Sequence, residues 1–567
     1  THVKTRRAVS TRPTGGGLML SVVRARAPPA ASLLPATESE RRIGCVDSYV
    51  VPQINIIVQQ SLQSRRFANG GAQYASCDLD THNCQTIEAA VQLAYDNIDR
   101  MSPFFLSKFW ARVSELLYRQ NKGSEKRQNK SDQVHQHMFH QFDTMISRTV
   151  ENMEDFNMMD FAQTAMSLAK IVKQISRGGS FPQSGLERIL QDILIGNSME
   201  NKQFIFNQIA WASIPVLPDF DPRNLSNFTY AYALAGCAPK FEDGSSLFDY
   251  VADEAIPNLS YFNSQDLSNI VWAYATAEHS HPRLFSKVAD HIVALEDLDL
   301  FTPQALSNIA WAYATAEDSQ PRLFLKLADA AVKRKNLDSQ SVANFLWSFA
   351  ANGEIDKRLF SSFVPTTKSL IGKYDCQNLA NISWAYAVAN NDAPSLFNDD
   401  FIHCCLKKEE DFTIENLLQL YQWHLWQIEI KSRIRLPPSL KNKCYKAFIS
   451  LAPRPSAFQN NVISELTSMG LKLKEEVLTP RGYRLDAVVK MNGKIIGVEV
   501  DGPFHFLGRE LKGRTLLKRR QIAKLEKIPL VSVPYWEWNR LGKNSRKKHQ
   551  YLHSLIGLDE NNTSGAE

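Results

Sequence analysis

Three acidic residues near the C-terminus have a spacing that would bring their side chains to one face of a β-hairpin: Asp486, Glu499 and Asp501. The pair Asn492-Gly493 stands between two alternating apolar runs, which is typical of a two-residue hairpin turn. Such a turn pairs Met491 with Lys494, and the same register sets Asp486 opposite Glu499. Opposed side chains lie about 4.5–5.5 Å apart and alternate residues share a face, so the sequence predicts one acidic cluster.

Carboxylates that share one face repel each other unless a cation or a basic side chain lies beside them. In one interpretation, the basic segment downstream and Arg484, which the register sets opposite Asp501, neutralise the cluster without any cofactor. In the other, Asp486 and Glu499 bind Mg²⁺, which prefers oxygen ligands, and its bound water attacks a phosphodiester. The catalytic set would then be Asp486, Glu499, Asp501 and Lys518.

A strongly basic segment follows the acidic cluster. Residues 505–550 hold 13 Lys and Arg against 3 Glu, whereas the whole chain has a formal net charge of +6 and residues 38–504 are net acidic. A polyanion would therefore be held mainly by this segment, through phosphate contacts that carry little sequence information. The residues expected to contact RNA here are His505, Arg509, Lys512, Arg514, Lys518, Arg519, Arg520 and Lys524.

Upstream, one helical motif recurs five times between residues 225 and 387, as in Leu267-Ser-Asn269-Ile-Val-Trp272-Ala-Tyr274-Ala. The asparagines of successive copies are 42, 39, 36 and 37 residues apart, a mean of 38.5. A period of this size is typical of a helical solenoid, in which each unit buries its apolar face against its neighbours. Within one period the apolar spacing predicts helix-turn-helix, and Pro282 and Pro321 each begin a second helix.

The repeat motif continues beyond the five clear copies in weaker form. Degenerate copies are expected at residues 102–111, 160–169 and 204–214, and residues 416–426 are expected to close the array as an atypical terminal helix. The polar stretch at residues 121–134 is expected to be a loop.

The fixed asparagines allow two interpretations. Either each amide ties its helix to the next repeat, because a buried amide must be hydrogen-bonded, or it faces a ligand. We favour the first, because the aromatic residue three positions later shares its helix face and is expected in the core. Variable positions in a constant frame are better candidates for contacts with RNA bases, as in repeat proteins that bind one base per unit. These lie where the motif helices begin: Asn224, Gln265, Asp266, Gln304, Ala305, Gln340, Ser341, Gln377 and Asn378.

Residues 458–556 resemble a RAP domain, a small module named for RNA-binding proteins abundant in apicomplexans. The resemblance rests on Leu485-Asp486, Val498-Glu-Val-Asp-Gly-Pro-Phe-His-Phe506, Leu516-Leu-Lys-Arg519 and Val533-Pro-Tyr-Trp-Glu-Trp538. The repeats resemble octotricopeptide (OPR) repeats. Arrays of this kind that end in a RAP domain occur in organellar RNA-maturation factors and, similarly, in the FAST-kinase-domain family.

The RAP domain in turn resembles the restriction-endonuclease-like fold. This resemblance assigns Asp486 and Glu499 to the two metal-binding acids, but Asp501 stands where these nucleases have a lysine that orients the attacking water. Lys518 would replace that lysine only if its helix packs over the sheet, and a solvated position on a basic helix is the favoured expectation. RNA binding is therefore expected in preference to cleavage.

The predicted fold is thus an α-solenoid of helix-turn-helix repeats of about 38 residues at 86–430, followed by an α/β, restriction-endonuclease-like RAP domain at 458–556. Residues 1–40 contain six Lys and Arg and no acidic residue before Glu38, which is typical of an organellar transit peptide. Residues 557–567 are expected to be a disordered tail. Nowhere are 18 consecutive residues apolar, so no transmembrane helix is expected.

These features predict an RNA-binding protein of the mitochondrial matrix or the chloroplast stroma. Its repeats would select an organellar mRNA or rRNA and its RAP domain would bind it, in RNA processing, stability or translation, with ribosomal or nuclease proteins as partners and no membrane. Two alternatives stay open. One is a Mg²⁺-dependent endoribonuclease that uses the acidic cluster, and the other is a protein-interaction scaffold without RNA contact, which the net acidic repeats favour.

Overall fold

The structure is a computed structural model that describes residues 83–122, 132–177, 185–194, 199–491 and 494–557. These residues divide into two compact units, one ending at His291 and one beginning at Ile292. The predicted transit peptide, the Asn492-Gly493 turn, most of the 121–134 loop and nearly all of the predicted tail lie outside the described residues. No helix in the described part of the chain is both long and apolar enough to cross a membrane.

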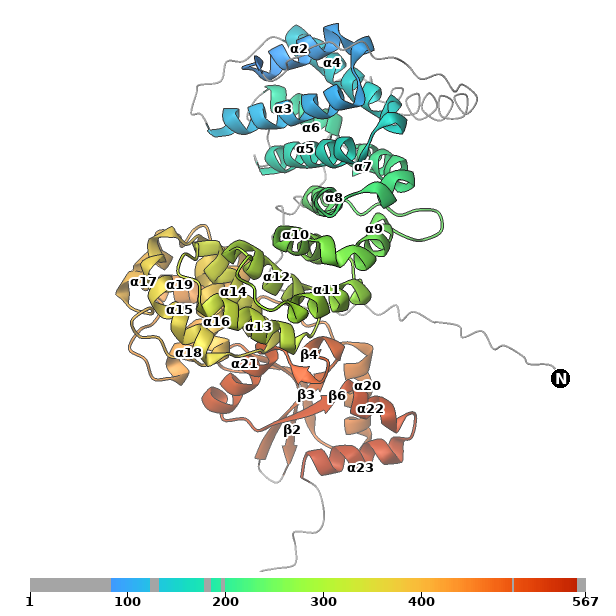
Figure 1. The fold of residues 1–567 in the computed structure, drawn as a ribbon. Helices are drawn as coiled ribbons and strands as arrows, with labels where there is room; N and C mark the ends of the chain where they lie inside the picture. Colours follow the sequence, from blue (N-terminus) through green and yellow to red (C-terminus); the bar gives the residue numbers. More distant parts are fainter. Residues whose placement is uncertain (1–82, 123–131, 178–184, 195–198, 492–493, 558–567) are drawn as a thin grey trace, which may run out of the picture. The chain divides into compact units, whose positions relative to one another are not determined.

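In the N-terminal unit, four helices pack side by side in sequence order and form one row (Figure 1). They are α3 (Pro103–Lys122), α5 (Met158–Arg177), α8 (Pro222–Ala235) and α10 (Ser264–Thr276). The other helices lie outside this row and are α2 (Ile87–Asp96), α4 (Asp132–Glu151), α6 (Gly185–Leu194), α7 (Met199–Ser213), α9 (Leu247–Ala255) and α11 (Pro282–Ala294). The repeat motif lies on α8 and α10, and its weaker copies lie on α3 and α5.

A second row forms in the C-terminal unit in the same way. It consists of α12 (Pro303–Ala316), α14 (Ser339–Asn352), α16 (Cys376–Ala389) and α18 (Ile414–Glu429), and its partner helices are α13 (Pro321–Val332), α15 (Lys357–Ser369), α17 (Asp399–Lys407) and α19 (Pro438–Ile449). Pro282 and Pro321 are the first residues of α11 and α13, as the helix-turn-helix prediction requires. The predicted terminal helix α18 is followed by one more helix, α19, which packs against it.

The second aromatic residue of the repeat motif joins the two helices of neighbouring repeats. Tyr232 and Tyr386 are fully buried, and each hydroxyl donates to the backbone carbonyl of a phenylalanine 26 residues earlier, Phe206 at 2.7 Å and Phe360 at 2.8 Å. The bond ties each motif helix to the second helix of the preceding repeat. A buried hydroxyl needs such a partner, and these backbone carbonyls supply it.

The expectation of a degenerate repeat motif at residues 204–214 is wrong. Helix α5 packs directly against α8, and α7, which carries these residues, stands outside the row. Phe206 accepts the bond from Tyr232, which is the role of a second helix. Trp211, the tryptophan of this segment, is 49% exposed.

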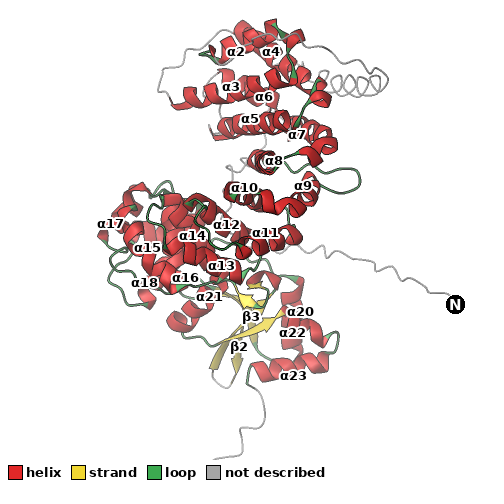
Figure 2. Ribbon diagram, in the orientation of Figure 1, coloured by secondary structure: helices red, strands yellow, loops and turns green. Residues whose placement is uncertain are grey.

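The C-terminal α/β domain contains all the strands of the described chain (Figure 2). Its four-stranded sheet has the order β1-β2-β3-β6, from β1 (Leu473–Leu478), β2 (Arg484–Met491), β3 (Lys494–Asp501) and β6 (Leu530–Pro534), and a small hairpin pairs β4 (Phe506–Leu507) with β5 (Glu510–Leu511). The helices are α20 (Ala457–Ser468), α21 (Gly513–Gln521), α22 (Tyr535–Leu541) and α23 (Ser545–Leu555). Strands β3 and β6 are parallel, so α21 is the crossover between them.

The two faces of this sheet have different partners. Alternate residues of β2 and β3, including Ala487, Val489, Val498 and Val500, face α20, α22 and α23 and form an apolar core with Trp538. The acidic residues occupy the intervening positions and therefore lie on the opposite face, which α21 covers.

Candidate nucleic-acid interface and acidic cluster

The β2–β3 hairpin has the predicted register. Met491 pairs with Lys494, and the pairing continues as far as Ala487 with Val498. Beyond that pair, a side chain joins the two strands: one carboxylate oxygen of Asp486 accepts a 2.7 Å hydrogen bond from the backbone amide of Val500. The strands therefore separate where the acidic residues begin.

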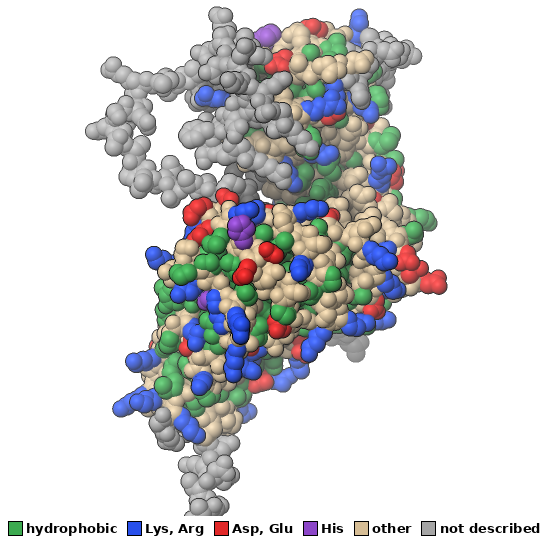
Figure 3. Space-filling model, turned by 90° about the vertical axis from the view of Figure 1, so that its left-hand side faces the viewer, with side chains coloured by type: hydrophobic (Ala, Val, Ile, Leu, Met, Phe, Trp, Pro, Cys, Tyr) green, Lys and Arg blue, Asp and Glu red, His purple; other side chains and the backbone are tan. Residues whose placement is uncertain are grey.

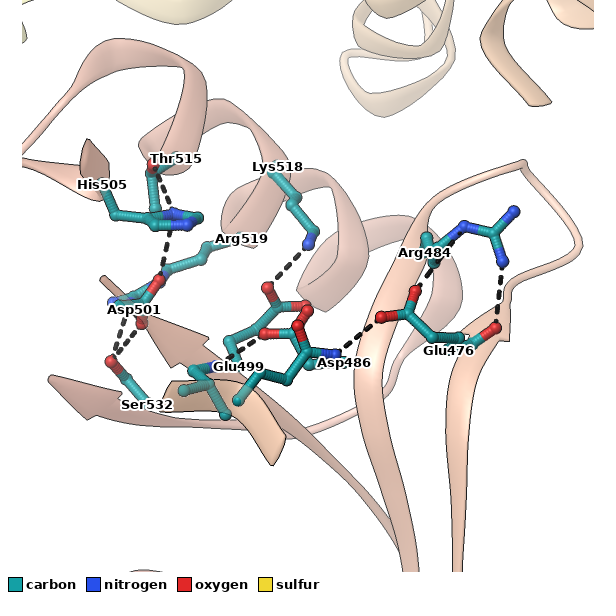
Figure 4. Close-up of polar contacts among 12 residues, drawn as sticks. Glu476, Arg484, Asp486, Glu499, Asp501, His505, Thr515, Lys518, Arg519 and Ser532 are labelled. Atoms are coloured by element: carbon teal, nitrogen blue, oxygen red, sulfur yellow. Dashed lines mark hydrogen bonds and ion pairs between the residues drawn. The ribbon is translucent and has the colours of Figure 1, made fainter. Parts of the chain in front are cut away.

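Asp486, Glu499 and Asp501 gather on one face, as predicted, and the basic segment downstream supplies the cations that face them (Figure 4). Lys518 of α21 donates to Oε2 of Glu499 at 2.6 Å, and Arg519 pairs with Asp501. Glu499 and Asp501 are only 3% and 1% exposed. The favoured expectation that Lys518 is solvated is therefore wrong, because α21 packs over the sheet.

Arg484 does not neutralise the cluster. It pairs with Glu476 on the neighbouring strand β1, at 3.8 Å from Nε to Oε2, and donates to the backbone carbonyl of the same residue at 3.2 Å. The side chain of Asp501 is instead surrounded by Arg519, by the hydroxyl of Ser532 and by Nδ1 of His505 at 3.2 Å.

Burial controls the protonation of this cluster. It raises the pKa of Glu499 to about 8, against the opposing effect of Lys518. It lowers the pKa of His505 to about 4, so this ring is neutral near pH 7. Burial also lowers the pKa of Lys518, but the carboxylates around it raise this pKa by more. Three carboxyl groups thus face two cations, and one proton, which burial places on Glu499, makes the cluster neutral.

The predicted Mg²⁺ site does not fit this arrangement. Asp486 already binds a backbone amide, Lys518 occupies Oε2 of Glu499, and Asp501 is held by Arg519 and Ser532. The buried Oε1 of Glu499 has no hydrogen-bond partner, but a single free oxygen beside an ammonium group is no cation site. In the described part of the chain, no group of three His, Cys, Asp or Glu side chains is placed to hold a metal ion.

Several residues expected to contact RNA are used instead to attach the α/β domain to the repeats of the C-terminal unit. Arg520 donates to Glu429 of α18 at 2.9 Å and to the carbonyls of Ala387 and Val388 at the end of α16. Lys512, which is 6% exposed, pairs with Glu317 at 2.6 Å. Basic side chains of α21 and of Lys512, the residue before it, therefore form contacts inside the C-terminal unit.

The start of α21 approaches α14 so closely that only glycine fits. A Cβ added at Gly513 would overlap the carbonyl oxygen of Ala350. On the repeat side, Gly353 has a φ of +77°, and a Cβ there would lie 2.7 Å from the carbonyl oxygen of Leu511. This fit, together with a 2.9 Å bond from Gln521 to the Gln422 carbonyl, fixes the domain on the last three helices of the row.

The segment that runs from β3 through α21 to α23 also has a match among known protein families. Residues 498–555 match the RAP domain. The matched residues lie within the span 458–556 that was expected to form this domain. The RAP domain is generally associated with RNA binding. No curated protein matches the chain.

Basic residues that the sequence reasoning did not single out are exposed at the far end of the RAP domain. They lie where α22 meets α23 and are Arg540, Lys543, Arg546 and Lys547, which we call the α22–α23 corner. Of the eight residues predicted in this domain, Arg509 and Lys524 are exposed as well, whereas His505 and Arg514 are half-buried. The face drawn in Figure 3, which is the left-hand side of Figure 1, carries Lys and Arg side chains interspersed with acidic and hydrophobic ones. Four cations within eight residues, with no acidic residue among them, were the signal in the sequence.

The positions predicted to read RNA bases in the repeats separate into two groups. Gln265, Gln304 and Gln340 are exposed, and Gln377 and Asn378 are half-buried. Asp266 and Ser341 are 4% and 1% exposed and do not face solvent. Asp266 accepts bonds from the amide of Asn263 at 3.2 Å and from the hydroxyl of Ser226 in the preceding motif helix at 3.2 Å. Asp266 therefore connects two successive repeats and has a structural role.

One motif asparagine, Asn381, has the structural role that was favoured. Asn381 is 4% exposed, and its Oδ1 accepts a 3.1 Å bond from Gln419 of the next helix in the row. The aromatic residues three positions later differ among copies. Trp347 is 1% exposed, whereas Trp311 and Trp272 are half-buried, so the expectation that this position is core holds only for part of the array.

Proposed function

We propose that this protein binds organellar RNA, that its repeats select an mRNA or rRNA, and that its RAP domain holds the RNA backbone. The observation that carries the proposal is the α22–α23 corner of the RAP domain. Its four exposed cations suit phosphate contacts, which contribute most of the affinity for a polyanion and little sequence information. The predicted contacts Arg509 and Lys524 are exposed and support the same role.

The repeats would supply the selectivity. Gln265, Gln304 and Gln340 recur at the same place in successive motif helices, and all three are exposed. A constant helical frame with amide side chains at one repeated position suits contacts with the edges of unpaired bases, as expected of OPR-like arrays. Asp266 and Ser341 are removed from this set because they are buried.

We further propose that the protein acts in the mitochondrial matrix or the chloroplast stroma, in RNA processing, stability or translation. Residues 1–37 contain arginines and no acidic residue, and this composition supports import into an organelle. Ribosomal or nuclease proteins would be its partners in such a role.

A Mg²⁺-dependent endoribonuclease is the second candidate, and one contact favours it. Restriction-endonuclease-like nucleases have a lysine at the position of Asp501. Lys518, which extends from the crossover helix α21 and donates to Glu499, lies close to where that lysine would act. The burial of Glu499 and the engagement of Asp486 and Asp501 argue against access of RNA to this face. We therefore assign the cluster to the attachment of α21 to the sheet.

Crosslinking of RNA to the protein in cells, followed by sequencing of the bound RNA, tests the proposal. Recovery of defined organellar transcripts, with crosslinked peptides from the RAP domain and the motif helices, is the expected result. A protein that recovers no RNA above background would be the scaffold of the third hypothesis.

A further inference from the structure

Three lysines lie together on the sheet of the α/β domain, and the proposed function has not used them. They are Lys472, Lys474 and Lys490, which we call the lysine strip, and all three are exposed. Lys472 directly precedes β1, Lys474 lies on β1 and Lys490 lies on β2. The strip is therefore outside residues 498–555, which match the RAP domain.

The lysine strip occupies one face of the sheet. Leu473 packs against the apolar core of the domain and pairs with Val489, which is part of that core. Because successive side chains of a strand alternate between the two faces, the lysine strip lies on the opposite face. This is the face that α21 covers at Glu499, and the exposure of the three lysines shows that the end of the sheet near the β2–β3 turn is left open.

The positive charge of the lysine strip is not compensated within the described part of the chain. None of its three side chains forms an ion pair or a hydrogen bond with another described residue. Lys472 and Lys490 are directly opposite each other, because the amide of Lys490 donates to the carbonyl of Lys472 at 3.2 Å. Like charges in opposed positions destabilise a sheet, and an anionic partner would relieve their repulsion.

The acidic residues that follow the strip on β1 do not neutralise it. Glu475 pairs with Ala487, a residue of the apolar core, and so belongs to the other face of the sheet. Glu476 is already held by Arg484 and accepts a 2.6 Å hydrogen bond from Gln459. The open end of this face is therefore positive.

Protection of a sheet edge explains only part of the lysine strip. Lysines on edge strands keep other chains from pairing there, and β1 is an edge strand. Lys490, however, lies on β2, which has a neighbour on each side. Its partner on β3 is Ile495, an apolar side chain that is 50% exposed on the same face. The surface thus extends inward from the edge and combines cations with an apolar group.

We propose that the lysine strip is a second RNA-binding surface, on the face of the sheet opposite the helices that carry the α22–α23 corner. Its lysines contact the phosphates of an unpaired strand, and Ile495 lies against a ribose or a base. Lys472 and Lys474 are two residues apart, about 6.5 Å along an extended strand, which suits neighbouring phosphates of an extended RNA. This inference rests on the proposed RNA-binding function and adds to it contacts on β1 and β2.

The test measures the affinity of the full chain for a fluorescein-labelled single-stranded RNA of mixed sequence, by fluorescence anisotropy at several salt concentrations. Lys472→Gln/Lys474→Gln/Lys490→Gln should bind about tenfold more weakly at low salt and lower the salt slope by about 2, at about 0.7 for each lost phosphate contact. The charge-matched control replaces three exposed lysines of the same unit by glutamine and should keep the wild-type slope: Lys333, Lys335 and Lys368.

Two single variants of one hairpin test which face binds RNA. Lys490→Gln removes a lysine of the strip and should lower the salt slope by about 0.7. Lys494 is also exposed, but it is four residues from Val498 on the same strand and therefore lies on the core face. Lys494→Gln should keep the wild-type slope, and equal losses in the two variants would contradict binding on one face.

The outcomes separate this inference from the function on which it rests. The triple variant should unfold at the wild-type temperature or slightly above it, because it removes like-charge repulsion. If it is less stable than the wild type, Lys490→Gln alone decides. If the wild type binds RNA and the strip variants bind with equal affinity and slope, the lysine strip is no RNA surface. If the wild type binds no RNA, the proposed function fails and this inference fails with it.

Discussion

Arg520 of α21 donates from Nε to Oε1 of Glu429, the last residue of α18, across 2.9 Å. Glu429 has a side chain that is 4% exposed, and the same guanidinium also donates to two carbonyls at the end of α16. A planar group with five donors is suited to several acceptors at once, which lysine is not. Arg520 of the RAP domain thus binds the C-terminal ends of two repeat helices, α16 and α18.

Replacement of Arg520 by alanine should destabilise the protein by about 3–5 kcal/mol, because it leaves a buried carboxylate unpaired. Arg520→Lys should recover only part of this loss. The measurement is chemical denaturation of the full chain, with Arg540→Ala, an exposed arginine of the same domain, as the control within about 0.5 kcal/mol of wild type. Equal stability of the Arg520 and Arg540 variants would contradict the docking of α21 on the repeats.

Two tryptophans at the same motif position should respond differently to truncation. Trp347 is 1% exposed and Trp311 half-buried, so Trp347→Ala should cost about 3–5 kcal/mol and Trp311→Ala clearly less. Thermal unfolding of the two variants side by side gives the comparison. Similar losses at both sites would mean that the two positions are buried alike.

Much of the fold could be predicted because each prediction depended on local chemistry. The hairpin register follows from one turn and the alternation of its strands, and the helix starts at Pro282 and Pro321 follow from the missing amide of proline. The place of α7 could not be predicted in this way. Its apolar spacing resembles that of a motif helix, and only the packing of α5 against α8 assigns it to the other set.

Asp266 should be important for stability, although its position suggested a contact with RNA. Asp266→Ala removes a capping interaction with Asn263 and the bond from Ser226, and we expect a loss of about 1–3 kcal/mol. The neighbouring Gln265→Ala, at an exposed position, should change stability by less than about 0.5 kcal/mol. Urea denaturation distinguishes the two, and a neutral Asp266→Ala would show that the capping contacts contribute little.

Stability should decrease as the pH rises from about 4.5 to about 8, in part because of Glu499. Its pKa in the folded protein is raised to about 8 by burial, so the folded state keeps a proton that the unfolded chain releases at lower pH. The stabilisation is fully present below the unfolded pKa and is lost as the pH approaches 8. Glu499→Gln, which cannot ionise, should flatten this dependence by up to a few kcal/mol.

The same variant tests the second candidate function. Denaturation midpoints of wild type and Glu499→Gln across this pH range show whether the proton resides on Glu499, and identical curves would place it elsewhere. RNA cleavage that requires Mg²⁺ and disappears in Glu499→Gln would make the protein a nuclease despite the burial of the cluster.

Only the acidic residues of the candidate site could be placed from the sequence. Strand alternation places Asp486, Glu499 and Asp501 on one face from the sequence alone. Which cations face them depends on how α21 packs, and a basic helix has the same sequence whether its charges meet water, acids or carbonyl groups. Lys518, Arg519 and Arg520 therefore changed from expected RNA contacts to internal partners. The α22–α23 corner stood out in the structure because none of its four cations is used in this way among the described contacts.

The most direct measurement is the affinity of the full chain for single-stranded RNA as a function of salt, with and without the α22–α23 corner. The variant Arg540→Ala/Lys543→Ala/Arg546→Ala/Lys547→Ala should bind more weakly and lower the salt slope by about 2 to 3, at about 0.7 for each lost phosphate contact. The matched control replaces four exposed lysines of the C-terminal unit, Lys333, Lys335, Lys357 and Lys368, and should keep the wild-type slope. Equal slopes for wild type and the corner variant would contradict the account.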